Sequence, residues 1–202
     1  MGGKAKRGRP TETTPIYSVE RSDHSVFESD RELDVLQRLL DESFEKAGER
    51  LIAAWGKENR LSARQLAGFR GVKLVAVASV NLRGEPRVAP RSAAFLHGKF
   101  YLAANAKSVL VRRLKVDPAV AMTYFENHLL VMAHGTTVLI QKGDSGFREV
   151  ASEWVKAFDG GRGSLQGIEV LLRVEATHLQ AFALHPEQYP EEWGRASLAS
   201  RT

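Results

Sequence analysis

The residues best suited to chemistry in this 202-residue sequence are a few cations and a hydroxyl that could bind an anion together. Lys107 and Ser108 stand at the expected start of a short helix, and Arg112 follows one turn later. A helix N-terminus presents free N–H groups and a partial positive charge, which favours phosphate. Arg87 opens an earlier strand, and a curled sheet would bring its guanidinium to the same anion. The alternative interpretation is that all four are solvated surface groups.

Other motifs exclude several enzyme classes. The sequence has no cysteine, which excludes thiol catalysis, disulfides and cysteine-based metal sites. Its six histidines form neither an HExxH nor an HxxxH pair, so no metal site is expected. The GDSG segment at residues 143–146 matches the nucleophile segment of trypsin-like serine proteases, but a helix start before Phe147 explains it better. No residue is assigned a catalytic role.

The composition is that of an ordinary globular chain, with 43% hydrophobic and 26% charged residues. A net charge of +5 does not by itself predict nucleic-acid binding. The longest apolar runs are far shorter than the roughly 20 residues of a membrane-spanning helix. No apolar targeting segment follows the charged first residues. We therefore expect a cytoplasmic protein without a membrane partner.

Pattern changes divide the chain into four segments. Residues 1–28 are polar and without period, which predicts a flexible basic tail. Within it, the RGRP motif at residues 7–10 matches the core of the AT-hook, an element of the DNA minor groove. One copy of so short a match favours a plain basic tail, so nucleic acid is not an expected partner. Residues 29–71 are expected to be helical, 72–184 to form a β domain, and 185–202 to form a C-terminal tail.

Apolar periodicity predicts two helices before the β domain. An S-x-x-E capping box at residues 29–32 begins a stripe of apolar residues at spacings of three and four. This stripe predicts one long helix that ends near Gly56. A second capping box at residues 62–65 begins a short helix that stops at Gly71. The stripe consists of Leu33, Leu36, Leu40, Phe44, Ala47, Leu51 and Trp55.

Strand patterns and turn residues dominate from residue 73 onwards. A short helix is expected from Ser108 to just before Asp117, and another from residue 144 or 145. Gly135, in the middle of a strand, predicts a bulge or a close backbone approach. The last strand segment reads as one long bent strand or two. The expected strand segments span residues 73–81, 87–97, 99–105, 119–126, 129–141 and 168–184.

The order and spacing of these motifs resembles the pyridoxamine 5′-phosphate oxidase-like family, the FMN-binding split barrels. That family carries P-x-V-x-P on its second strand, G-x-ϕ-Y-ϕ on its third, and S-x-K-x-x-N-L-x-x-D-P-x-V across a helix into the fourth. Residues 86–90, 98–102 and 108–120 follow this layout, and Gly135 matches the glycine of the fifth strand. The resemblance covers about residues 62–183.

This resemblance implies a mainly β fold with flanking helices (α+β): a six-stranded antiparallel split β-barrel preceded by N-terminal helices. It also implies a homodimer with flavin sites at its interface, and FMN as the cofactor of residues 72–184. The second strand would run along the flavin ring, and the charged groups would bind the phosphate. The implied cofactor-binding residues are Arg87, Val88, Ala89, Pro90, Arg91, Lys107, Ser108 and Arg112.

The sequence departs from the family pattern at three places. Leu110 stands where members often carry a phosphate-binding lysine, and Arg113 stands in place of asparagine. Lys107 or Arg112 would compensate, and Leu110→Lys is expected to leave binding unchanged or tighten it. The RQ pair of the vitamin B6 oxidases is replaced by leucines at residues 129–130, which argues against vitamin B6 specificity.

Three classes of function remain open. The leading hypothesis is a flavin-dependent oxidoreductase acting on an unknown small organic substrate, with FMN or a deazaflavin as cofactor. The second is a non-catalytic protein that binds flavin, deazaflavin or haem on the same barrel. The third is a DNA-associated protein that uses the RGRP motif. The candidate haem ligands are His97, His128, His134 and His178.

A homodimer is also predicted from apolar residues of the fourth and fifth strands. Closing the barrel is expected to leave their alternating apolar face uncovered, except where the long N-terminal helix reaches it. An exposed patch of this kind usually marks an interface between proteins. The residues expected on this face are Val120, Met122, Tyr124, Val131 and Ala133.

Overall fold

The computed structural model describes residues 28–69, 71–81, 83–126, 128–157, 168–189 and 191. The predicted tail therefore lies outside the described residues except for Glu28, and so do the RGRP motif and most of the C-terminal segment. The helices are α1 (Asp30–Glu45), α2 (Glu49–Trp55), α3 (Ala63–Ala67), α4 (Val109–Leu114) and α5 (Phe147–Ala157), with a 3₁₀ turn η3 (Pro186–Gln188). The strands are β1 (Val72–Val80), β2 (Pro86–Leu96), β3 (Lys99–Ala104), β4 (Ala119–Glu126), β5 (Leu129–Gln141) and β6 (Val170–Ala183).

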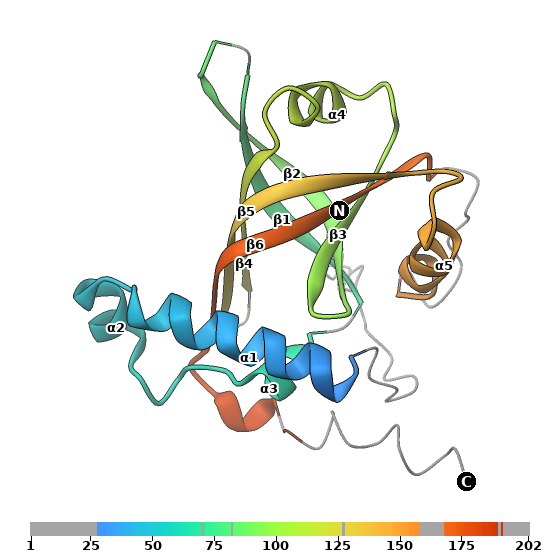
Figure 1. The fold of residues 1–202 in the computed structure, drawn as a ribbon. Helices are drawn as coiled ribbons and strands as arrows, with labels where there is room; N and C mark the ends of the chain where they lie inside the picture. Colours follow the sequence, from blue (N-terminus) through green and yellow to red (C-terminus); the bar gives the residue numbers. More distant parts are fainter. Residues whose placement is uncertain are drawn as a thin grey trace, which may run out of the picture.

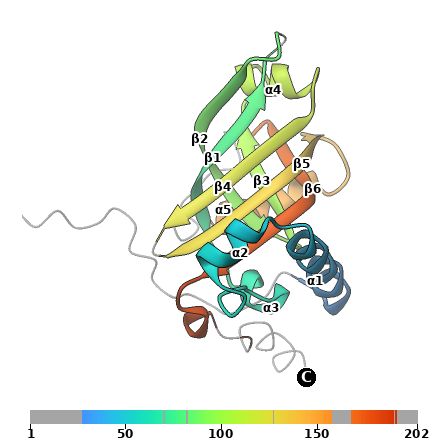
Figure 2. The ribbon, with the colours of Figure 1, turned by 90° about the vertical axis from the view of Figure 1, so that its left-hand side faces the viewer.

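The six strands form a closed barrel in the order β1-β2-β3-β6-β5-β4, and every neighbouring pair is antiparallel. The predicted six-stranded antiparallel barrel with flanking helices is therefore confirmed. Figures 1 and 2 show α4 at one end of the barrel, beside the β1–β2 hairpin, and α1 to α3 at the other end. None of the helices in the described part of the chain is long and apolar enough to cross a membrane.

Turn chemistry sets the ends of the strands, which fall within one or two residues of the predicted ones for β1 to β5. The predicted bulge at Gly135 is confirmed, because the β5–β6 register shifts between His134 and Gly135. A Cβ atom on Gly135 would lie 2.0 Å from the carbonyl oxygen of Glu175. Only glycine lets the two backbones approach this closely. The last segment is one strand, β6, rather than two.

The barrel interior holds the main core, and this overturns the basis on which the homodimer was predicted. Apolar residues of β4 and β5 expected on an uncovered face point inward instead. Their side chains belong to the core cluster together with leucines of α1 and α3. Alternation identifies residues that share one side of a strand, but not which side faces the interior. The exposed fractions are 6% for Val120, 4% for Met122, 8% for Tyr124, 2% for Val131 and 1% for Ala133.

The N-terminal region contains two helices where one long helix was predicted. Helix α1 ends at Glu45, and Gly48 takes an extended conformation as the N-cap of α2. The apolar stripe continues across this break, which is why periodicity alone did not reveal it. Both predicted capping boxes are confirmed, at the starts of α1 and α3. Helix α1 packs on β6, where the hydroxyl of Ser43 accepts a hydrogen bond from the N–H of Leu179 at 2.8 Å.

A second, smaller core lies on the outer side of the barrel beneath α5. Phe147, Ala151 and Trp154 of this helix are buried against residues of β2, β3 and β6. These residues form the buried side of the helix, which begins at Phe147, a few residues after the predicted start at residue 144 or 145. The residues that directly follow α5 lie outside the described ones. The two cores together fix the part of β2 that pairs with β3.

Candidate functional site

The barrel is split along one half of β2. Strand β2 pairs with β1 from Pro86 to Ala94, but with β3 only from Ala93 to Leu96. No strand in the described part of the chain pairs with the other edge of residues 86–92. Backbone groups on that edge need partners, because an unpaired N–H or C=O is costly once water is excluded. This edge is therefore suited to receive a ligand with polar atoms along one side.

The side chains of this half of β2 are exposed or half-buried. Val88 is 69% exposed, and Pro90 is also exposed. Ala89 and Arg91 are half-buried. The guanidinium of Arg87 lies 2.8 Å from the carboxylate of Glu85, so part of its charge is already matched. The strand therefore offers apolar surface and backbone groups more than free positive charge.

The other predicted anion-binding residues lie across the split, at the start of α4. The Ser108 hydroxyl is the N-cap of this helix and accepts a hydrogen bond from Val111 N–H at 3.2 Å. Lys107 and Arg112 are exposed. The backbone N–H of Ala106 donates to a carboxylate oxygen of Glu169 at 2.8 Å. The loop before α4 thus already holds one anionic group.

Arg87 and the residues at the start of α4 lie at the same end of the barrel, but on opposite sides of the split and without direct contacts between them. Continuing the β2–β3 register places Ala104 level with Arg91, on the far side of the split. Within the described ranges, no hydrogen bond or ion pair connects Arg87 to Lys107 or Ser108. Their convergence on one phosphate remains a hypothesis.

Position 110 is not part of an anion site. Leu110 is only 7% exposed and belongs to the main core. The helix turns this side chain toward the barrel, whereas its neighbour Val109 is 49% exposed. The expectation that Leu110→Lys would leave binding unchanged or tighten it is therefore wrong, because the new ammonium would be buried.

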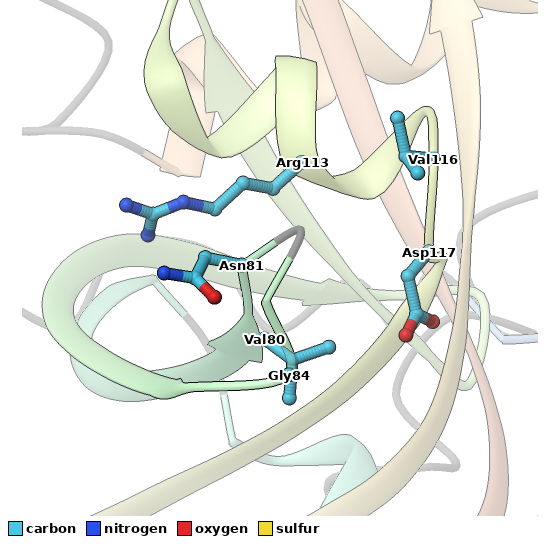
Figure 3. A pocket seen from close by; sticks show the side chains of 6 residues that line it. All are labelled: Val80, Asn81, Gly84, Arg113, Val116 and Asp117. Carbon is cyan, nitrogen blue, oxygen red and sulfur yellow. The ribbon is translucent and has the colours of Figure 1, made fainter.

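A hollow of about 230 Å³ lies between the β1–β2 hairpin and the end of α4 (Figure 3). In Figure 3 the Arg113 side chain extends over Asn81, while Asp117 lies on the opposite side of the hollow. Asn81 shapes the hairpin, because its side-chain oxygen accepts hydrogen bonds from the N–H groups of Arg83 and Glu85 at 2.9 and 3.0 Å. Sequence reasoning missed this hollow because its residues meet only in the folded chain. The lining residues are Val80, Asn81, Gly84, Arg113, Val116 and Asp117.

An apolar surface covers the outside of β1, β2 and β4, and we call it the outer apolar face. Directly paired residues share one side of a sheet, so Ala76 and Pro90 lie together on this face. The β1–β4 register, continued by two pairs beyond Ala76 and Thr123, places Phe125 beside Leu74. Leu74 and Phe125 are each 66% exposed. The face comprises Leu74, Ala76, Val88, Pro90 and Phe125.

A cluster of ionisable groups lies at the barrel end away from α4. Burial lowers the pKa of Lys73, and the carboxylate of Glu126 partly opposes this. The ammonium of Lys73 lies 5.3 Å from the ring centre of Phe69. Burial and donation to Glu126, at 2.6 Å, raise the pKa of Tyr124. Tyr124 and Glu126 are hydrogen-bonded to each other, and the whole cluster lies outside the split.

The four histidines named as haem ligands do not converge. His97 lies in the β2–β3 turn, between carboxylates of α1 and α5. His128 lies in the β4–β5 turn, where its ring is 6.3 Å from that of His185. His134 and His178 lie opposite each other on β5 and β6. Among the described residues, no group of three or more His, Cys, Asp or Glu side chains is arranged to hold a metal ion.

Comparisons with known proteins bear on the fold. No protein-family model matches the chain, and no curated protein sequence matches it. Among solved structures, it is similar to the conserved hypothetical protein Rv2991 from Mycobacterium tuberculosis, with a TM-score of 0.50 and 16% sequence identity over 71% of this chain and 89% of that chain.

Two further solved structures are similar at lower TM-scores. One is an F420 reductase, with a TM-score of 0.44 and 19% identity over 55% of this chain and 90% of that chain. The other is a pyridoxamine 5′-phosphate oxidase-related, FMN-binding protein from Nostoc punctiforme, with a TM-score of 0.42 and 16% identity over 55% and 74%. Strand order and strand pairing show a closed six-stranded antiparallel barrel, and the mycobacterial structure shares this fold.

Proposed function

We propose that this chain is a flavin-binding oxidoreductase that acts on a small organic substrate and holds FMN or a deazaflavin along β2. The observation that carries the proposal is the edge of residues 86–92, which no strand of the described residues pairs, beside the exposed apolar side chain of Val88. A flavin ring has apolar faces and a polar edge. A strand edge with available N–H and C=O groups next to apolar side chains matches both features.

The charged groups around the split fit a phosphate in part. Lys107 and Arg112 are exposed and can form charge-assisted hydrogen bonds. The Ser108 hydroxyl accepts from the helix backbone, and its own proton remains to be donated. Arg87 shares its charge with Glu85. We therefore assign the phosphate chiefly to Lys107 and Arg112, with a smaller contribution from Arg87.

The chemistry is divided between cofactor and chain. A bound flavin supplies the electron transfer, and the protein supplies binding, orientation and exclusion of water. In this proposal, the backbone of residues 88–91 orients the ring. The apolar side chains of Val88 and Pro90 exclude water from it. Proton transfer is assigned to no side chain of the described residues.

A second copy of the chain is part of the proposal. The hollow beside α4 measures about 230 Å³, below the roughly 300–1,000 Å³ of typical small-molecule pockets. The outer apolar face continues from β2 across β1 to β4 and contains no charged side chain among the five residues that define it. Pairing of two such faces would bury this surface and supply a second wall for a ligand lying along β2.

The test begins with the visible spectrum of the purified chain and mass spectrometry of any released ligand. Oxidised FMN gives two broad bands in the blue and near-ultraviolet, a deazaflavin gives one band, and haem gives a Soret peak. FMN is then titrated into stripped protein and followed by fluorescence quenching. The proposal fails if the wild-type chain binds neither FMN nor a deazaflavin, or if haem alone is found.

Single substitutions locate the phosphate. Lys107→Ala and Arg112→Ala should each weaken FMN binding by about tenfold, since a charge-assisted hydrogen bond contributes about 1.5–3 kcal/mol. Arg87→Ala should weaken binding less, because Glu85 already pairs with this guanidinium. Arg38→Ala, an exposed cation of α1, is the matched control and should bind as wild type does. Equal binding by all four variants would move the phosphate site elsewhere.

A further inference from the structure

Two histidines face each other on the outside of the barrel, on neighbouring strands. His134 of β5 and His178 of β6 are direct pairing partners, and both side chains are exposed. Their ring centres lie 6.4 Å apart. The adjacent pair, Ala133 and Leu179, is buried at 1% exposure each, which fixes the histidines on the opposite, outward side.

A β-bulge at Gly135 directly follows this histidine pair. The register shifts just after His134, so Thr177 is left without a pairing partner between Ala176 and His178. A Cβ on Gly135 would collide with the carbonyl oxygen of Glu175 at 2.0 Å, so the close approach requires glycine. The pairing of His134 with His178 belongs to the regular register before the bulge, and the bulge places the extra residue, Thr177, next to the pair.

The side chain of Thr177 favours one tautomer of the His178 ring. Its hydroxyl donates a hydrogen bond to the carbonyl oxygen of His134 at 3.3 Å. The hydroxyl oxygen of Thr177 also lies 3.3 Å from Nδ1 of His178. A hydroxyl has one proton, so toward His178 this oxygen acts as an acceptor. Nδ1 then carries the proton of the neutral ring, and Nε2 keeps its lone pair.

A ring whose Nδ1–H donates to an oxygen while Nε2 keeps its lone pair has the form of a metal-binding histidine. A metal-binding histidine usually donates its second N–H to a neighbouring oxygen, which fixes the tautomer and the direction of the free nitrogen. With metal–nitrogen distances of about 2.0–2.1 Å, two rings on one ion have centres about 4.5–5.3 Å apart at square-planar or tetrahedral angles. The ring centres of His134 and His178 are 6.4 Å apart, so these two exposed side chains must turn toward each other when the ion binds.

We propose that His134 and His178 bind a divalent transition-metal ion on the outer surface of the barrel. Imidazole nitrogens suit Cu²⁺, Ni²⁺ and Zn²⁺, and Cu²⁺ should bind most tightly. The described residues offer no third His, Cys, Asp or Glu for the same ion, so water completes its coordination. The site does not depend on flavin binding along β2.

The test uses the full-length chain without a histidine tag, at about pH 7.5, where imidazoles are largely neutral. Calorimetric titration with Cu²⁺, and separately with Zn²⁺, should show one ion per chain. His134→Gln and His178→Gln should each weaken binding by at least tenfold, and Thr177→Val by about tenfold, the lower end for a lost outer-shell partner. His128→Gln is the matched control, since this ring also faces another histidine, His185.

Three results would overturn the proposal. One is a wild-type chain that binds neither ion. Another is unchanged affinity in both the His134 and His178 variants. The third is loss of binding in the His128 variant alone, which would place the ion at the other histidine pair. Circular dichroism of each variant checks the fold, and a metal-dependent rise in melting temperature gives an independent readout of binding.

Discussion

The imidazole of His97 lies between the carboxylates of two different helices. Its Nε2 is 3.0 Å from an oxygen of Glu153 on α5, and its Nδ1 is 3.4 Å from an oxygen of Glu32 on α1. The adjacent Gly98 N–H donates to Glu28 at 3.1 Å. The β2–β3 turn is thereby tied to α1, to the residue before α1 and to α5. Burial opposes protonation of His97, but Glu153, Glu32 and Glu28 outweigh it and raise its pKa.

This cluster predicts that the fold loses stability as pH rises. Because the folded pKa of His97 is raised, its contribution is complete below the unfolded value of about 6.5 and is lost as pH rises through the folded pKa. Burial also raises the pKa of Glu28, so ionisation of this group costs stability above its ordinary pKa. The raised pKa values of His97 and Glu28 therefore both lower the free energy of unfolding as pH rises.

The check is the melting temperature as a function of pH. His97→Asn should melt below wild type at pH 6, and the difference should shrink as pH rises. Asparagine tolerates the positive φ of 52° at this position, so backbone strain is matched. Glu28→Gln separates the second contribution by removing only that ionisation. A difference between wild type and His97→Asn that stays constant with pH would contradict the assignment to His97.

Gly135→Ala should strongly destabilise the barrel. The added methyl would lie 2.0 Å from the Glu175 carbonyl oxygen and 2.8 Å from the Cα atom of Ala176. Overpacking of this kind costs about 1–3 kcal/mol or more, because backbone must move. Gly48→Ala is the control, since nothing lies within 4 Å of its added Cβ, and its cost should stay below about 1 kcal/mol. Urea denaturation of both variants measures the two costs, and equal losses would exclude the close approach as their cause.

Leu110→Lys should destabilise the chain by several kcal/mol, because it replaces a core side chain with a buried ammonium. Val109→Lys is the matched control one residue earlier. Its side chain is 49% exposed, so the new charge stays in water and the cost should be small. Denaturant midpoints compare the two variants. If both variants unfolded at the same midpoint, Leu110 would not face the core.

The sequence predicted the barrel well where local chemistry sets the structure. The ends of β4 and β5 were predicted to the residue, because Pro118 and the tight turn before Leu129 punctuate a clear strand pattern. The break at Gly48 was missed, because the apolar stripe continues from α1 into α2. The direction of the β4 and β5 side chains was also wrong, since alternation does not say which side becomes the interior.

The candidate sites depend more heavily on tertiary structure. Both halves of β2 read as strand, and only the pairing pattern reveals that residues 86–92 have one edge that no strand in the described part of the chain pairs. The resemblance pointed to this segment, but spacing alone did not. His134 and His178 are distant in sequence and meet only through the β5–β6 register. Gly135 was the one local signal, because its position in mid-strand predicted the bulge next to them.

The outer apolar face should hold two copies of the chain together. Leu74 and Phe125 lie side by side across β1 and β4, each 66% exposed, next to the β2 edge proposed for the flavin. A carboxylate at Leu74 would have to be desolvated when two such faces pair, so Leu74→Glu should shift the particle from twice 22.4 kDa to the single-chain mass. Val138→Glu is the control, because Val138 is an exposed strand valine on β5, outside this face.

Sedimentation equilibrium at several concentrations measures the mass, with circular dichroism to confirm that each variant folds. A wild-type chain that sediments as a single copy at every concentration would reject the dimer. A Leu74→Glu variant that stays dimeric would move the interface to another face, and the flavin site would then have to be completed without the outer apolar face.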